Sequence, residues 1–180
     1  MPKQIAQRLK ANLLLKSNWI SFIAGLSLVF AYAPFSLWWL PLIILPVWLK
    51  QIDSCSAKNA AKQGFLFAFG WFSSGISWVH VSIDEFGGMP LAVSLLLMLL
   101  LCLYLAIYPA LACYLSARFA RDKAFNLWLL PPFWLLGEYL RGTVFTGFPW
   151  LSLGYSQIDG PLSYLAPVIG ETGITLTLMI

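Results

Sequence analysis

The feature that most restricts the fold of this chain is a stretch without a single charged residue, from Asn18 to Leu49. Its 32 residues are too many for one upright membrane helix, at about 1.5 Å per residue, and few for two full-length ones. Ala33-Pro34 marks a turn near the middle. We therefore expect a hairpin of two short spans, the second from Leu37 to Leu49 and interrupted by its prolines.

Apolar runs of similar character continue through the rest of the chain. Hydrophobic residues make up 60% and charged residues only 10% of the sequence, against about 25% charged in an average soluble domain. The further runs are Gly64 to Ser82, Pro90 to Ala117, Ala124 to Tyr139 and Pro161 to Ile180. The sequence thus predicts an all-α fold, a polytopic membrane helix bundle of about six transmembrane helices with short loops, over residues 18–180, after a basic N-terminus at residues 1–17.

The positive residues predict the orientation of this bundle. If the N-terminus is cytoplasmic and the spans alternate, ten of the eleven Lys and Arg residues lie on the inner side: Lys3, Arg8, Lys10, Lys16, Lys50, Lys58, Lys62, Arg118, Arg121 and Lys123. A single span over Asn18 to Leu49 would move six of these ten to the outside, against the positive-inside rule. The net charge of +4 therefore indicates topology, and we expect no nucleic-acid partner.

One loop combines turn-forming residues with aromatics in an unusual way. Arg141 to Gln157 reads RGTVFTGFPWLSLGYSQ, too apolar for an ordinary solvated loop and too rich in Gly and Pro for a helix. Trp and Tyr rings favour the lipid headgroup layer, and the polar side chains can hold a headgroup or a protein partner. We expect the function to reside here, with Trp150, Tyr155 and Gln157 as candidate lipid-binding residues. The alternative for Trp150 is a simple interfacial anchor.

Three ionisable residues near this loop are further candidates. Glu138 and Arg141 are three positions apart, the spacing at which helix side chains meet, so they are expected to pair and fix the base of the loop. Alternatively, Arg141 faces a lipid phosphate, which suits a guanidinium group. Glu171 falls within the last apolar run, where an ionisable residue indicates either a functional site or a satisfied hydrogen bond between helices.

The cysteines indicate neither a disulfide framework nor a metal site. Cys55 lies in a polar loop, Cys102 and Cys113 lie inside an apolar run, and no CxxC or Cys/His spacing occurs. We expect no metal, no cofactor and no catalytic residue within this sequence.

Several strings together resemble one family of membrane proteins. AYAPF (31–35), GISWVHVSIDEFGGMP (75–90), LRGTVFTGFPWLSLGYSQIDGPL (140–162) and APVIGETGI (166–174) resemble the N-terminal membrane domain of bacterial apolipoprotein N-acyltransferase. The resemblance implies an inner-membrane protein with a lipid-accessible cavity. It also implies two partners, a phosphatidylethanolamine-like acyl donor and the diacylglyceryl-cysteine N-terminus of a lipoprotein. Trp150 matches a functionally important loop tryptophan of the family.

In that family the chemistry belongs to a nitrilase-like domain with a Glu-Lys-Cys triad, which follows the membrane domain. The sequence here stops before such a domain, so the resemblance implies a fragment that is inactive alone. The alternatives are a small-solute transporter, favoured by Glu171 and the proline-broken runs, and a scaffold protein that anchors a partner in the membrane.

Overall fold

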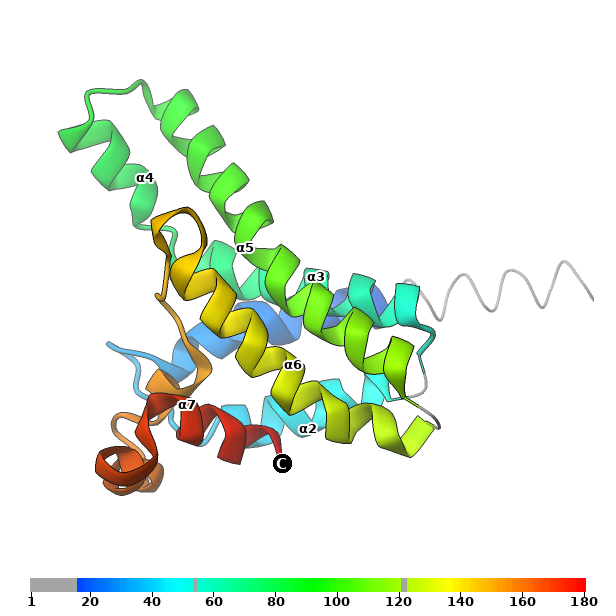
Figure 1. The fold of residues 1–180 in the computed structure, drawn as a ribbon. Helices are drawn as coiled ribbons and strands as arrows, with labels where there is room; N and C mark the ends of the chain where they lie inside the picture. Colours follow the sequence, from blue (N-terminus) through cyan, green and yellow to red (C-terminus); the bar gives the residue numbers. More distant parts are fainter. Residues whose placement is uncertain (1–15, 54, 121–122) are drawn as a thin grey trace, which may run out of the picture.

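The computed structural model describes residues 16–53, 55–120 and 123–180, and in these ranges the regular secondary structure is all helical, with no strand (Figure 1). Most of the predicted basic N-terminus, residues 1–15, lies outside the described residues. Residues 16–28 form the first helix. The elements that follow are η1 (Val29–Ala31), α2 (Pro41–Ile52), α3 (Ala57–Gly75), α4 (Val79–Val81), η2 (Ser82–Phe86), α5 (Leu91–Phe119), α6 (Lys123–Thr143), η3 (Val144–Thr146), η4 (Leu153–Gln157), η5 (Pro161–Leu165) and α7 (Ala166–Met179).

The prediction of an all-helical membrane fold is confirmed, whereas the count of about six spans is not. Among the described residues, Leu91–Phe119 and Pro161–Met179 are long and apolar enough to cross a membrane by themselves. Ala57–Gly75 with Val79–Phe86 adds a third candidate if the pair, bent by 55°, acts as one span. Pro41–Ile52 is apolar but has only 12 residues.

Helix α3 is central because its glycines allow close approach by its neighbours. A Cβ on Gly25, in the first helix, would lie 1.8 Å from the Phe67 carbonyl oxygen, and one on Gly70 would lie 2.4 Å from that of Phe22. Small residues at such crossings let two helix backbones touch. The first helix and α3 therefore pack closely against each other.

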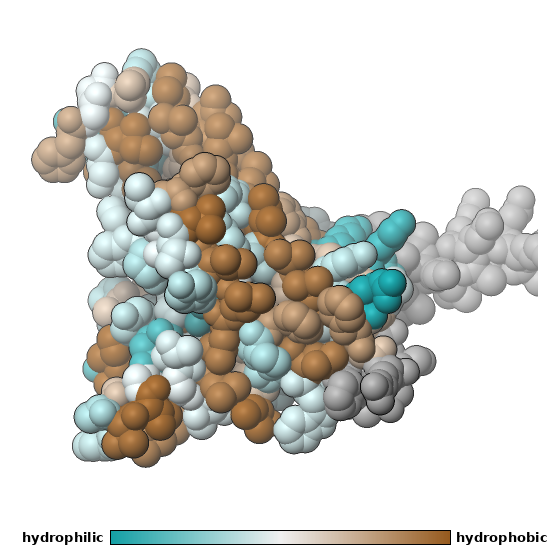
Figure 2. Space-filling model, in the orientation of Figure 1, coloured by the Kyte–Doolittle hydropathy of each residue, from teal (hydrophilic) through white to brown (hydrophobic). Residues whose placement is uncertain are grey.

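Four aromatic residues fill the space between α2, α3 and α6. Trp48, Phe67, Trp71 and Trp134 are all buried, and the Trp48 and Phe67 rings stack with centroids 4.1 Å apart. Large apolar side chains also cover much of the outer surface, as the brown areas of Figure 2 show. Contiguous exposed apolar surface of this kind suits contact with lipid.

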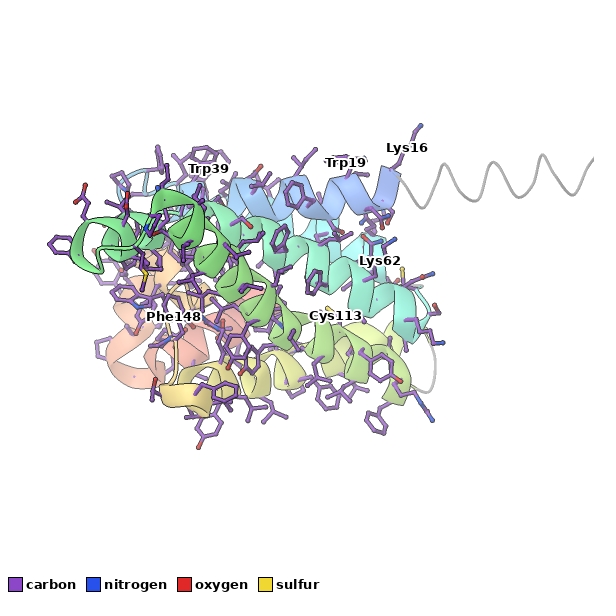
Figure 3. All side chains as sticks on the ribbon, turned by 90° about the horizontal axis from the view of Figure 1, so that it is seen from above. Lys16, Trp19, Trp39, Lys62, Cys113 and Phe148 are labelled. Carbon is purple, nitrogen blue, oxygen red and sulfur yellow. The ribbon has the colours of Figure 1, made fainter. Side chains whose placement is uncertain are left out.

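The two ends of the bundle differ in character. Lys16 and Lys62 lie at one end, and Phe148 lies toward the other (Figure 3). This separation of basic residues from the aromatic loop agrees with the charge pattern of the sequence.

Two predicted boundaries were wrong. The third run does not continue as one helix to Ser82, because α3 ends at Gly75 and the chain bends before α4. The aromatic loop begins later than expected, because α6 continues to Thr143. A glycine such as Gly142 near the end of a helix costs only about 1 kcal/mol, which neighbouring contacts offset.

Candidate functional site

The chain reverses direction sharply after α6. Phe145, Thr146 and Gly147 have φ values of 52°, 71° and 81°, a left-handed conformation that glycine adopts most easily. A Cβ on Gly147 would lie 2.0 Å from the Gly142 carbonyl oxygen, so only glycine fits. The Phe148 amide then donates to the Arg141 carbonyl oxygen at 2.8 Å. The loop thus folds back onto the last turn of α6.

Arg141 holds this returning loop through its side chain. Its Nη1 donates to the carbonyl oxygens of Phe148, at 2.9 Å, and of Trp150. The guanidinium carbon lies 5.3 Å from the centre of the Phe72 ring, and the residue is only 2% exposed. A buried guanidinium needs such partners. Arg141 is therefore attached to the backbone of the loop that carries Trp150, whereas the lipid-phosphate contact considered from the sequence stays a prediction.

Glu138 holds the next part of the loop. Its Oε1 accepts hydrogen bonds from the Leu153 amide at 3.0 Å and from Trp134 Nε1 at 3.3 Å. No hydrogen bond or ion pair joins Glu138 directly to Arg141 in the part of the chain that the structure describes. Both side chains are instead bonded to the backbone of the same loop.

Ser152 connects the loop to the last helix. Its hydroxyl lies within hydrogen-bonding distance of two carboxyl groups, Oε2 of Glu138 at 3.0 Å and Oε1 of Glu171. Thr175 Oγ1 also donates to Glu171 Oε1, at 3.1 Å. Glu171 directly follows a break in α7 at Gly170, where φ is 66°. Its carboxyl group is therefore hydrogen-bonded across elements, one of the two explanations given for it above.

The segment between the first helix and α2 completes the arrangement. Tyr32 donates its hydroxyl proton to the Ser152 carbonyl oxygen at 3.2 Å, and Gln157 Nε2 donates to the Trp38 carbonyl oxygen at 2.8 Å. Both hydrogen bonds attach this segment to the aromatic loop.

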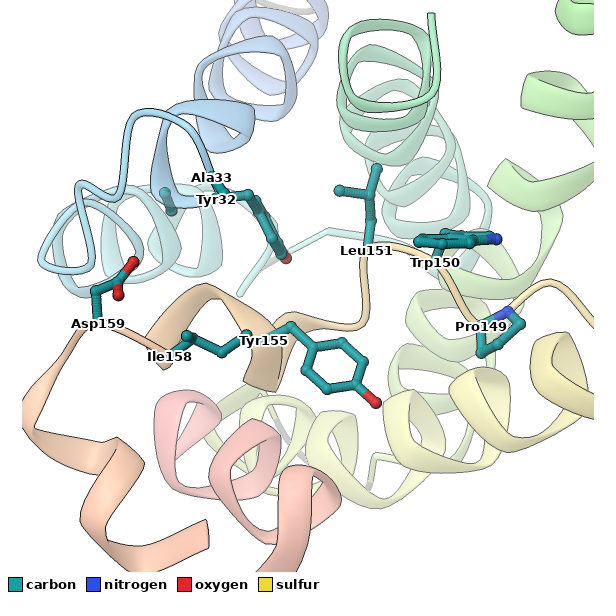
Figure 4. A pocket seen from close by; sticks show the side chains of 9 residues that line it. Tyr32, Ala33, Pro149, Trp150, Leu151, Tyr155, Ile158 and Asp159 are labelled. Carbon is teal, nitrogen blue, oxygen red and sulfur yellow. The ribbon is translucent and has the colours of Figure 1, made fainter. Parts of the chain in front are cut away.

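These contacts enclose a cavity of about 440 Å³ near the end of the bundle that carries the loop (Figure 4). It is lined by Ala31, Tyr32, Ala33, Pro149, Trp150, Leu151, Tyr155, Ile158 and Asp159. Trp150 and Tyr155 are 57% and 48% exposed, so their rings form part of the surface as well as the wall. Trp150 also meets Trp78 edge to face, with centroids 5.9 Å apart. A cavity with mostly apolar and aromatic walls suits a lipid or another amphiphile.

A smaller cavity of about 180 Å³ adjoins the first, since Pro149 and Tyr155 line both. Its wall includes Glu138, Arg141, Ser152 and Glu171, and is therefore much more polar.

The candidate residues from the sequence take different positions. Trp150 lines the large cavity, Glu138 and Arg141 line the small one, Tyr155 lines both, and Gln157 is buried and lines neither. Ser152 was among the polar loop residues considered from the sequence, but Tyr32 and Asp159 were not selected. Tyr32 falls within the string AYAPF (31–35), and Asp159 falls within the string that spans 140–162. The resemblance of these strings to the family was therefore the sequence signal that could have selected both residues.

Among the described residues, neither a metal-binding cluster nor a cysteine lines either cavity. The described residues contain no cluster of three or more His, Cys, Asp or Glu side chains placed to hold a metal ion. Cys102 and Cys113 are buried in α5, Cys55 lies between α2 and α3, and none of them lines the large cavity.

Comparison with known proteins identifies a family. The model described as "Apolipoprotein N-acyltransferase N-terminal domain" matches residues 24–180. The apolipoprotein N-acyltransferase of Shewanella oneidensis is 46% identical over 160 residues, which cover 87% of this chain and 31% of that protein. Those of Photobacterium profundum and Vibrio vulnificus are 45% and 48% identical, covering 87% and 89% of this chain and 31% and 32% of theirs. The chain thus spans about a third of the length of these curated relatives.

Proposed function

The chain belongs to the apolipoprotein N-acyltransferase family, and we propose that it is the membrane part of an enzyme that transfers an acyl chain from a phospholipid to the N-terminal diacylglyceryl-cysteine of lipoproteins. The observation that carries this proposal is the 440 Å³ cavity walled by Tyr32, Trp150 and Tyr155. Its size and apolar lining suit part of an acyl-bearing lipid.

We propose six spans, residues 18–180 as the membrane domain, residues 1–17 as a basic cytoplasmic segment, and the bacterial inner membrane as the location. The charge pattern supports this topology, because the alternating parse places ten of eleven basic residues on one side. The separation of Lys16 and Lys62 from Phe148 in Figure 3 also supports it. The aromatic loop and the cavity then face the periplasmic side.

Within such an enzyme the cavity would hold a phosphatidylethanolamine-like acyl donor or the diacylated end of the lipoprotein. Arg141 and Glu138 would act as positioning residues that keep the Trp150 backbone in place. The cysteines lie away from the cavity, so we propose that the covalent steps use a nitrilase-like domain with its own Glu, Lys and Cys residues. Accordingly, this 180-residue chain alone should not acylate a diacylated lipoprotein peptide.

Photo-crosslinking tests the lipid site. The chain is incorporated into lipid nanodiscs that contain a phospholipid with a diazirine in its acyl chain, and labelled peptides are mapped by mass spectrometry. We expect labelling of the segments 31–33 and 149–159. Trp150→Ala should reduce that labelling roughly tenfold, because loss of an aromatic wall removes about 1.5 kcal/mol of contact.

The matched control is Trp19→Ala, since Trp19 is 59% exposed, close to the exposure of Trp150, and does not line the cavity. It should leave the labelling unchanged. Equal labelling of the wild type and Trp150→Ala, with both folded, would contradict a lipid site at this cavity and favour the scaffold alternative.

A further inference from the structure

We propose that the space between α3, α5 and α6 binds a single water molecule, which accepts hydrogen bonds from Trp71 and Arg141 and donates one to Glu138. The site is separate from the two cavities described above. It does not depend on what the large cavity binds, so the proposal goes beyond the proposed function.

The first observation is the size of the space. A third cavity of about 10 Å³ lies between these helices. One water molecule needs roughly 10–15 Å³, so the cavity admits a water molecule and no larger ligand. Its walls come from α3 (Trp71 and Phe72), from α5 (Tyr108 and Pro109) and from α6 (Trp134, Gly137, Glu138 and Arg141).

The second observation is the indole nitrogen of Trp71. Trp71 is only 1% exposed, and its Nε1 is buried without a hydrogen-bond partner among the described residues. The neighbouring Trp134, whose ring centre is 6.4 Å away, donates from its own Nε1 to Glu138 Oε1. Leaving a buried donor unpaired is costly, and in proteins an ordered water is a common partner for such a group. Trp71 therefore needs an acceptor that the described side chains do not supply.

The third observation is the unused bonding capacity of the two charged residues. Arg141 bonds to described residues through Nη1 only, so its Nε and Nη2 protons have no hydrogen-bond partner among them. Glu138 Oε1 accepts from Leu153 and Trp134, and a carboxylate has lone pairs for about four donors. A water molecule matches this set, because its oxygen accepts from both free donors and its proton goes to the carboxylate.

The water accounts for the missing contact between Glu138 and Arg141. The two residues line the same cavity but do not bond each other directly within the described chain. A bridging water is nearly as favourable as a direct hydrogen bond, so the two charges interact through it. Trp71, as the third partner, connects α3 to both residues that hold the aromatic loop.

Nuclear magnetic resonance tests the site without a substitution. The indole nitrogens of the purified chain are isotopically labelled in detergent micelles, and cross-relaxation between water and each indole proton is measured. Trp71→Phe identifies the Trp71 signal. We expect a cross-peak between water and the Trp71 indole proton, although the side chain is buried from bulk solvent.

Gly137→Ala tests the site by filling it. An added Cβ at Gly137 would lie 3.4 Å from the Tyr108 carbonyl oxygen, an ordinary contact, and both residues line the cavity. The methyl group thus takes the space of the water and leaves Trp71 and Arg141 without their acceptor. We expect the water cross-peak to disappear and the equilibrium constant of unfolding to rise about tenfold. In a dry cavity the same change would lower that constant about fivefold, because alanine is the better helix former.

Gly142→Ala is the matched control. Gly142 also lies in α6, but an added Cβ there meets nothing within 4 Å, and the residue does not line the cavity. It should keep the water cross-peak and should not raise the equilibrium constant of unfolding. A wild-type Trp71 signal without water contact would overturn the water site, as would a Gly137→Ala chain at least as stable as Gly142→Ala. Neither result involves lipid labelling, so the proposed function is tested separately.

Discussion

Two buried polar networks, one toward each end of the bundle, are built from different groups. The first joins neutral side chains of the first helix, α2 and α3: Ser21 Oγ donates to Gln63 Oε1 at 2.6 Å and accepts from Trp48 Nε1 at 3.1 Å and Gln51 Nε2 at 2.8 Å. The second joins α6 and α7 to the aromatic loop through Glu138, Arg141, Ser152 and Glu171. We refer to them below as the amide network and the carboxyl network.

The two networks also differ in how completely they are satisfied. In the amide network, Ser21 uses its proton and both lone pairs, and Gln63 Nε2 donates to Asn18 Oδ1 at 3.0 Å. In the carboxyl network, the single proton of Ser152 faces two carboxyl groups. Neutral groups whose hydrogen bonds are all formed can join helices in an apolar medium at a low cost in free energy. Charged groups beside a cavity are consistent with the lipid site proposed at this end.

The largest effect expected on this comparison comes from Arg141→Ala. The substitution leaves the buried carbonyl oxygens of Phe148 and Trp150 without their donor and removes the charge beside Glu138, so we expect a loss of about 3 kcal/mol in the free energy of unfolding. Lipid labelling at segment 149–159 should also fall. Unfolding in mixed micelles measures the free energy of unfolding, and photo-crosslinking measures the lipid labelling.

Arg118→Ala is the control for that experiment, because Arg118 is an exposed arginine at the end of α5. It should change the free energy of unfolding by less than about 0.5 kcal/mol. A similarly small effect of Arg141→Ala would show that the loop is held without its guanidinium.

Ser21→Ala should separate stability from binding. It leaves Gln63 Oε1 and Trp48 Nε1 without their Ser21 partner, at a cost of about 2 kcal/mol in the free energy of unfolding. Because the amide network does not line the large cavity, lipid labelling of the folded protein should remain at the wild-type level. A parallel loss of labelling would mean that the two networks are coupled and would end the distinction drawn between them.

The smallest effect is expected for Glu171→Gln. Glu171 Oε1 accepts the bonds from Ser152 and Thr175, and an amide oxygen can accept both, so the free energy of unfolding should change by about 0.5 kcal/mol or less. Glu171→Leu removes the acceptor and should cost about 1.5 kcal/mol. If Gln is as damaging as Leu in unfolding experiments, the negative charge of Glu171 is itself required, contrary to its assignment as a hydrogen-bonding group.

Local patterns allowed much of this molecule to be predicted. Charge-free runs, glycines and prolines indicated the helical segments and the turn at Ala33-Pro34. The loop from Arg141 to Gln157 was selected for its aromatics, and Trp150 and Tyr155 do line the cavity. The family resemblance is confirmed by the match over residues 24–180.

Spacing along one helix did not predict which groups would be hydrogen-bond partners. Glu138 and Arg141 are near each other in sequence, yet each bonds the returning loop. Tyr32 and Ser152 are 120 positions apart and share a hydrogen bond. The side-chain period of a helix describes neighbours on that helix only, and contains no information about a loop that folds back across its end.

The sequence by itself determined that this chain is helical, apolar enough for a membrane, and a member of its family, because hydrophobicity, turn residues and recognisable strings are properties of contiguous residues. The tertiary structure alone decided which polar groups meet and where space remains. Residues 31–33 line one cavity with Pro149, Trp150, Leu151, Tyr155, Ile158 and Asp159 only because two distant parts of the chain are brought together. Hydrogen bonds and cavities depend on distances between atoms, which the order of residues does not contain.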